Sequence, residues 1–246
     1  MGQSSRRDTM RKWISFLNKN KDQFLIYAII FIAVILCTVL VRTRNRNIFT
    51  THLGTVNPLV SITIISMVGF VCFNILIKKD WFAVFQAENR GGYGIAAILS
   101  IVFCFEAIVL DLVFRFPKDM NILFPNSILY YPIVGFVVNI LFHVIIVTIV
   151  MGLLWLIAPH VKVEKTIWIA ILLTALVEPV YQMIFGVKAN GWTWLVVLTG
   201  IHVMLINLAQ LFLFRRYDFV SIYAMRLMFY LLWHIVWGMV RLNVLF

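Results

Sequence analysis

Polar side chains that could do chemistry recur at helical spacing inside the apolar stretches of this sequence. Asn139 and His143 lie four residues apart, as do Glu178 and Gln182, so each pair shares one face of a helix. Histidine and carboxylate side chains are common general acids, general bases and metal ligands. The pattern therefore indicates a polar site that could serve hydrolysis, proton relay or ligand binding.

The last part of the chain adds a second group of polar side chains. Arg226, Tyr230 and His234 follow one another at intervals of four residues, and His202 lies in the preceding apolar stretch. A helical rise of about 1.5 Å per residue places these groups near the middle of a hydrocarbon layer about 30 Å thick. The candidate catalytic residues are Glu178, His143, Asn139, His202, Arg226 and His234.

Charged side chains near the centre of a bilayer are unfavourable by about 2.5–3.5 kcal/mol each on insertion scales. We therefore predict that Glu178 and Arg226 stabilise each other. Glu106 could be the partner of a histidine or arginine of the core, or a member of the site itself. For Asp111, the expected partner is Arg115, four residues further along the same helix.

Several polar residues also have a purely structural interpretation. Asn207 and Gln210 could simply join transmembrane helices through hydrogen bonds of about 0.6 kcal/mol each. The three cysteines, Cys37, Cys72 and Cys104, lie far apart in apolar runs and are expected to be packing residues. No cofactor is predicted, although a divalent metal held by glutamate and histidine side chains stays open.

Composition defines the class of protein. The 246 residues are 63% hydrophobic and 13% charged, whereas soluble domains are near 45–50% apolar and 25% charged. A soluble globular protein and a nucleic-acid-binding protein are both excluded, despite the net charge of +11. Seven apolar stretches are long enough to cross a bilayer, so we predict an all-α, polytopic integral membrane helical bundle: 24–41, 58–77, 94–114, 128–158, 166–186, 192–214 and 219–240.

The predicted organisation is simple. Residues 1–23 form a basic cytoplasmic segment, and residues 24–246 form a single transmembrane domain with its functional core at 128–240. The first three helices are expected to be a peripheral support. Pro132 suggests a kink or an interfacial entry to the long fourth stretch, and Pro179 frees a backbone carbonyl in the fifth.

The distribution of lysine and arginine predicts the orientation. With the N-terminus inside, inner segments hold thirteen of these residues and outer segments seven. This bias favours a cytoplasmic N-terminus and, with seven spans, a C-terminus on the opposite side. The arginines of segment 42–46 oppose the bias.

Residues 128–238 resemble, in layout, the core of the CAAX-protease and bacteriocin-processing family of intramembrane proteases. The strongest likeness is LFLFRRYDFVSIYAMRLMFYLLWH, in which Arg215 and Arg216 begin the turn before the helix that carries the final histidine. VVNILFHV stands where the family has its Glu-Glu-x-x-x-Arg helix, and LLTALVEPVYQM stands where it has Phe-x-x-x-His.

The resemblance implies positions for the family's functional groups. Its paired glutamates fall on Val138 and Asn139 and its arginine on His143. Its phenylalanine and histidine fall on Glu178 and Gln182, and its last motif on Arg226 and Tyr230. The polar layer is kept in position, whereas the position of the glutamate that activates water carries no carboxylate.

Three hypotheses follow for function. The first is a catalytically divergent or inactive relative that binds a membrane partner or a lipidated peptide in a mid-membrane polar cavity. The second is an active intramembrane endopeptidase with a relocated site, in which Glu178 is the base and His143, His202 or His234 assists. The third is a small transporter or proton-relay subunit. In each case the lipid bilayer is a partner of the protein.

Overall fold

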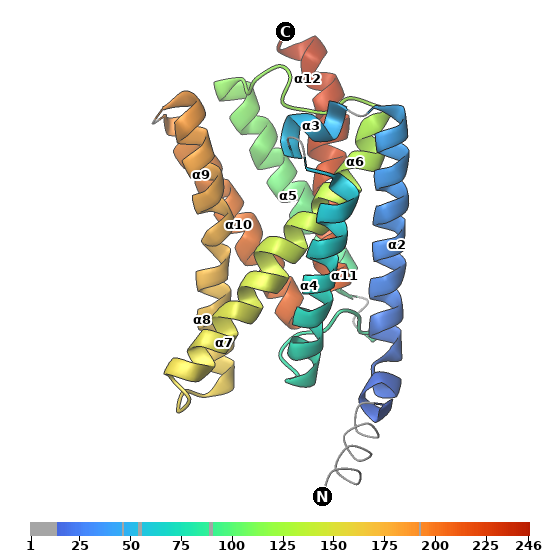
Figure 1. The fold of residues 1–246 in the computed structure, drawn as a ribbon. Helices are drawn as coiled ribbons and strands as arrows, with labels where there is room; N and C mark the ends of the chain where they lie inside the picture. Colours follow the sequence, from blue (N-terminus) through green and yellow to red (C-terminus); the bar gives the residue numbers. More distant parts are fainter. Residues whose placement is uncertain (1–13, 46, 54–55, 89–90, 192) are drawn as a thin grey trace, which may run out of the picture.

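Seven helical segments of the computed structural model are long and apolar enough to cross a membrane. The structure describes residues 14–45, 47–53, 56–88, 91–191 and 193–246, and these residues contain helices and no strands (Figure 1). The all-α polytopic bundle is therefore confirmed. The spans are Lys21–Arg44, Pro58–Lys78, Gly91–Phe114, Asn126–Ile157, Val163–Lys188, Trp194–Arg216 and Phe219–Val244.

Four of these spans are continuous α-helices, and three are built from shorter pieces. The continuous ones are α2 (Lys21–Arg44), α4 (Pro58–Lys78), α5 (Gly91–Phe114) and α10 (Trp194–Arg216). The composite ones are α6 (Asn126–Val138) with η1 (Asn139–Ile145) and α7 (Ile146–Ile157), then α8 (Val163–Ala175) with α9 (Val177–Asn190), then α11 (Phe219–Tyr230) with η2 (Leu231–Trp237) and α12 (Gly238–Val244). A short α3 (Asn47–Leu53) follows α2.

Local sequence signals explain where several helices begin. The Asn57 side chain accepts a hydrogen bond from the backbone amide of Leu59 at the start of α4. Thr193 caps α10 in the same way, and Asp218 caps α11. Short side chains with oxygen acceptors are favoured at this position because they satisfy backbone amides that have no partner within the helix.

The fourth span crosses the bundle diagonally (Figure 1). Its 32 residues are about 48 Å long at 1.5 Å per residue, which exceeds the hydrocarbon thickness of about 30 Å and therefore requires a tilt. The helix continues through Pro132, whose carbonyl accepts a hydrogen bond of 3.0 Å from the Tyr223 hydroxyl. This bond joins α6 to α11.

The fifth span is interrupted at Leu176, between α8 and α9. Pro179 has no amide hydrogen, so it cannot complete the usual bond to the carbonyl four residues earlier. Glu178 consequently stands in the first turn of α9, where the positive end of the helix dipole stabilises a carboxylate. The break positions the most strongly predicted site residue.

Two spans contain a π-helical turn, which the sequence did not reveal. η1 carries Asn139 and His143, and η2 carries His234. Such turns are rare within α-helices and often occur at functional sites. They show that three of the predicted site residues project from locally widened helix.

The two ends of the bundle differ. The connection between α4 and α5 buries the side chains of residues 81–84, and its carbonyls at Ala83 and Val84 accept bonds from the start of α11. The connection is therefore packed against the start of α11, and a second cavity of about 430 Å³ lies beside it, lined by Lys19, Asp80 and Phe82 among others. The described N-terminal residues lie at this end, and Phe246 lies at the other, the C-terminal end (Figure 1).

The third span is an integral part of the core. α5 packs against both α10 and α11, and the Ser100 hydroxyl donates to the Met225 carbonyl at 2.8 Å. Gly92 allows this close approach, since an added Cβ would lie 2.6 Å from the Ser221 hydroxyl oxygen. α5 thus shares the core predicted for residues 128–240.

Candidate functional site

Glu178 and Arg226 form the buried ion pair that the sequence predicts. Arg226 donates from both terminal nitrogens, at 3.3 Å to Oε1 and 3.1 Å to Oε2 of Glu178. Both side chains are buried, and they join α9 to α11. A two-point contact of this kind matches the planar guanidinium to the carboxylate and is among the stronger hydrogen-bonded arrangements in proteins.

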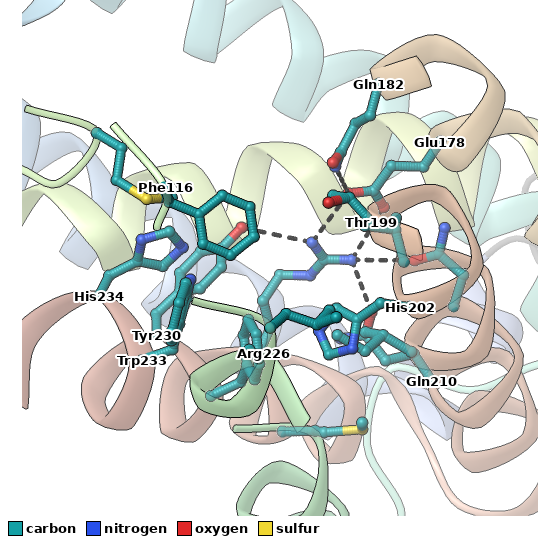
Figure 2. Close-up of a pocket in the computed structure, with 18 residues that line it drawn as sticks. Phe116, Glu178, Gln182, Thr199, His202, Gln210, Arg226, Tyr230, Trp233 and His234 are labelled. Atoms are coloured by element: carbon teal, nitrogen blue, oxygen red, sulfur yellow. Dashed lines mark hydrogen bonds and ion pairs between the residues drawn. The ribbon is translucent and has the colours of Figure 1, made fainter. Parts of the chain in front are cut away.

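The remaining hydrogen-bonding capacity of this pair is largely used by its neighbours. Arg226 also donates to Gln210 at 2.6 Å, to the Tyr230 hydroxyl at 3.4 Å and to Asn207 at 3.5 Å. Gln182 donates to Oε1 of Glu178 at 3.0 Å. Figure 2 shows the guanidinium at the centre of these contacts. The network places both charges in fixed, internally compensated positions.

A partly open cavity of about 250 Å³ lies beside this network, toward the end of the bundle that holds Phe246. The ion pair and its polar neighbours line one part of it, together with Thr199, His202 and His234 (Figure 2). The rest of its wall is mainly apolar and includes Ala107, Leu110, Phe116, Val203, Phe229 and Trp233. Such a mixture of apolar walls and few polar groups is typical of ligand-binding pockets.

His202 forms a second polar pair in the cavity wall. Its Nδ1 lies 3.2 Å from a carboxylate oxygen of Glu106, whose side chain is 41% exposed. The sequence left the partner of Glu106 open, and it is this histidine of α10. Both ring nitrogens of His202 are buried and form no hydrogen bond with the described residues, so the contact of Nδ1 with Glu106 is an electrostatic one.

His234 and His202 lie on opposite sides of Arg226 (Figure 2). Nδ1 of His234 is 2.7 Å from Oδ1 of Asn121, and its ring stacks on Tyr131 at 4.6 Å between centroids. Asn121 belongs to the connection before α6, and no local pattern in the sequence singles it out. His234 is therefore held by tertiary contacts.

Asn139 and His143 are placed behind the ion pair and do not line the cavity. The two side chains form a 3.1 Å hydrogen bond, as their spacing indicates, and both are fully or almost fully buried. His143 also interacts electrostatically with Arg226. Their position supports the network from η1 and separates them from a ligand in the cavity.

The expected Asp111–Arg115 pair is wrong. Asp111 instead forms a fully buried pair with Arg241, with contacts of 2.6 Å and 2.8 Å. Arg241 also donates to the Phe116 and Pro117 carbonyls. The predicted seventh stretch ended at residue 240, whereas the last helix continues through Arg241 and buries its side chain.

The structure thus brings four of the six candidates to one cavity: Glu178, Arg226, His202 and His234. Thr199 lines the same cavity. The sequence analysis did not identify it, because a single threonine in an apolar helix has no distinctive pattern. Within the described part of the chain, no group of three or more histidine, cysteine, aspartate or glutamate residues is arranged to hold a metal ion.

The seven apolar helices make this chain a multi-pass membrane protein whose outer surface contacts the lipid bilayer. Comparison with known proteins adds no relative: no family model, curated protein or solved structure matches the chain.

Proposed function

We propose that this protein binds a lipidated peptide of a membrane partner in the cavity and does not hydrolyse it. The observation that carries the proposal is the state of Glu178. Both of its oxygens accept hydrogen bonds from Arg226, and one also accepts from Gln182. A general base must be free to take a proton from water, and this carboxylate is held by its neighbours.

The form of the cavity favours binding. Its apolar wall, which includes Phe116, Val203 and Trp233, suits a hydrocarbon chain because burial of apolar surface is favourable by about 25 cal/mol per Å². Its polar floor suits the head to which such a chain is attached. Pockets for small molecules occupy about 300–1,000 Å³, so about 250 Å³ fits part of one chain.

The resemblance to the CAAX-protease family supports the same proposal. The positions that correspond to the family's motifs include Asn139, His143, Glu178 and Arg226, which lie in one interacting network. A protein that keeps this polar layer but lacks the family's paired glutamates is expected to keep recognition of a lipidated peptide and to lose its cleavage.

A cross-linking experiment tests this function. The purified protein in lipid nanodiscs is illuminated with a farnesylated peptide that carries a photoreactive diazirine. We expect labelling of cavity residues such as Phe116 and Trp233. Val203→Trp, which fills the cavity, should abolish this labelling, whereas Leu205→Trp on the exposed face of the same helix should not. Equal labelling of both variants would show that the probe is only in the bilayer.

One observation favours an active peptidase as a second candidate. His202 faces the cavity and has the Glu106 carboxylate behind it, an arrangement in which a carboxylate orients an imidazole for proton transfer. The same peptide, incubated with the purified protein, tests it by mass spectrometry. Cleavage that is lost in His202→Gln would establish the peptidase, and an intact peptide supports binding without hydrolysis.

A transporter is less consistent with the structure. The cavity residues that the structure describes come from the middle and the C-terminal half of the bundle. At the other end, residues 81–84 are buried beneath the start of α11. A transport path needs access from both sides of the membrane, and the residues that line this cavity do not reach that other end.

A further inference from the structure

The charges around the cavity are compensated within the protein. Glu178 and Arg226 neutralise each other on the floor. Glu106, the acidic group behind the wall, lies against His202. Among the described residues that line the cavity, Glu178 and Arg226 are the carboxylate and the guanidinium, and each is the ionic partner of the other. A charged ligand would therefore enter the cavity without a counter-charge.

Four buried polar atoms of the lining residues His202, Asn207 and Arg226 form no hydrogen bond with the described residues. Nδ1 of His202 lies beside the Glu106 carboxylate, and Nε of Arg226 belongs to the guanidinium that Glu178 neutralises. Two atoms are then left for a ligand. Nε2 of His202 and Nδ2 of Asn207 are both buried and have no hydrogen-bond partner among the residues that the structure describes. Both residues line the cavity and belong to α10. A buried polar atom without a partner is unfavourable by about 1–3 kcal/mol, so a ligand that satisfies both atoms gains affinity.

These two groups have opposite hydrogen-bonding character. The amide nitrogen of Asn207 is a donor, and its orientation follows from the contact between its oxygen and Arg226. The carboxylate of Glu106 lies beside Nδ1 of His202 and favours the tautomer with the proton on that nitrogen, which leaves Nε2 as an acceptor. The cavity thus offers one donor and one acceptor.

From this arrangement we propose that the cavity selects an uncharged ligand head that both accepts and donates a hydrogen bond, an amide or a hydroxyl, attached to an apolar chain. The inference rests on the proposed binding function and specifies its ligand class. The carbonyl or hydroxyl oxygen accepts from Asn207, and the N–H or O–H donates to His202. A peptide bond beside a lipidated residue has both groups.

Carboxylate and amine heads are disfavoured for one physical reason. Moving an unpaired charge from water into a low-dielectric site is strongly unfavourable unless a counter-charge meets it. The guanidinium of Arg226 is engaged by Glu178 and Gln210, so an anion would have to displace an internal partner. A cation would have to displace Arg226 itself from Glu178.

The experiment is a competition against the photoreactive farnesylated peptide in nanodiscs. Five competitors share one dodecyl chain and differ in the head: amide, alcohol, methyl ester, carboxylate and amine. Concentrations are compared at equal mole fraction in the bilayer, and labelling that persists in Val203→Trp is subtracted. We expect the amide and the alcohol to compete best, and the ester, which lacks a donor, about tenfold more weakly.

The proposed contacts of the ligand head with His202 and with Asn207 predict the effect of substituting each residue. His202→Phe and Asn207→Leu keep an apolar chain site but remove one polar group each. His202→Phe should bring the amide and the ester to equal potency, because it removes the acceptor for the amide N–H. Asn207→Leu should weaken both about equally, because both carbonyls lose the same donor, and Leu205→Trp should leave potency and ratio unchanged. This ratio depends on recognition of the head and is not moved by a uniform loss of stability.

The outcomes separate the two proposals. If the carboxylate or the amine competes best, or the ester equals the amide in the wild type, the assignment of a neutral donor–acceptor head is overturned while binding in the cavity stands. If the peptide probe labels the wild type and Val203→Trp equally, the binding function itself is overturned.

Discussion

Charged side chains inside this bundle occur in complementary pairs. Two ion pairs have both partners buried: Glu178 with Arg226, and Asp111 with Arg241. Each pair joins helices that are distant in sequence. An unpaired charge in the same surroundings would be strongly destabilising. At the scale of single residues, the need for a partner explains the position of these acidic and basic groups.

The pair on the cavity floor leads to a prediction about stability. Glu178→Gln or Arg226→Gln alone should lower the free energy of unfolding in detergent by about 3–5 kcal/mol, because each leaves one buried charge without its partner. The double substitution should lose less than the sum of the two. Thermal unfolding followed by circular dichroism measures all three, and additive losses would contradict the pairing.

The second pair has its own test. Asp111→Asn should weaken the bonds that Arg241 forms with the 116–117 segment, since the arginine would be left as a buried charge without its partner. We expect faster amide hydrogen exchange in residues 115–121 and a destabilisation of about 3–5 kcal/mol. Arg115→Gln, at an exposed position, is the matched control and should behave like the wild type.

At the scale of elements, interruptions in the helices place the site. The break before Pro179 puts Glu178 at a helix start, and the π-helical turns η1 and η2 carry Asn139, His143 and His234. Regular α-helices would present these side chains in other directions, because a π-turn shifts the residues that follow it. The polar network thus depends on departures from regular helix.

Packing between α5 and α11 provides a test at this scale. Gly92→Leu should destabilise the protein by more than about 2 kcal/mol, because its Cβ would meet Ser221 and Tyr217 at 2.6 Å and 2.8 Å. Gly94→Leu, where an added Cβ meets nothing within 4 Å, should be neutral or stabilising, since leucine is the better helix former. Equal losses of stability in the two variants would contradict the close approach at Gly92.

At the scale of the whole molecule, the unequal ends of the bundle matter for function. Residues 81–84 are buried at the end near the described N-terminal residues, whereas the cavity beside the Glu178–Arg226 pair lies toward the end that holds Phe246. A lysine and arginine excess in the segments predicted as inner predicts that the end near the described N-terminal residues faces the cytoplasm. A ligand would then reach the cavity from the opposite side or from the outer half of the bilayer.

Cysteine labelling tests this orientation. In a protein whose cysteines at 37, 72 and 104 are replaced by alanine, Asp119→Cys and Lys162→Cys place one thiol at each end of the bundle. In intact cells an impermeant maleimide should label position 119 and should reach position 162 only after permeabilisation. The reverse pattern would invert the predicted topology.

Composition and residue type alone determined the class of protein and its most constrained contact. Seven apolar stretches predict seven spans because only a closed, hydrogen-bonded helix satisfies the backbone in lipid. Glu178 and Arg226 were predicted to pair because each would otherwise be an unpaired charge near the middle of the membrane. Both predictions follow from what apolar and charged residue types require in a lipid bilayer, whatever the packing of the helices.

Tertiary structure decided the rest. Asp111 and Arg241 are 130 residues apart, and nothing in local spacing distinguishes this partner from Arg115. The pairing of Glu106 with His202 and the cavity beside it likewise depend on how α5 meets α10. Spacing along one helix indicates which side chains share a face, whereas the packing of the helices determines which residues that face contacts. The site consists of such contacts between helices.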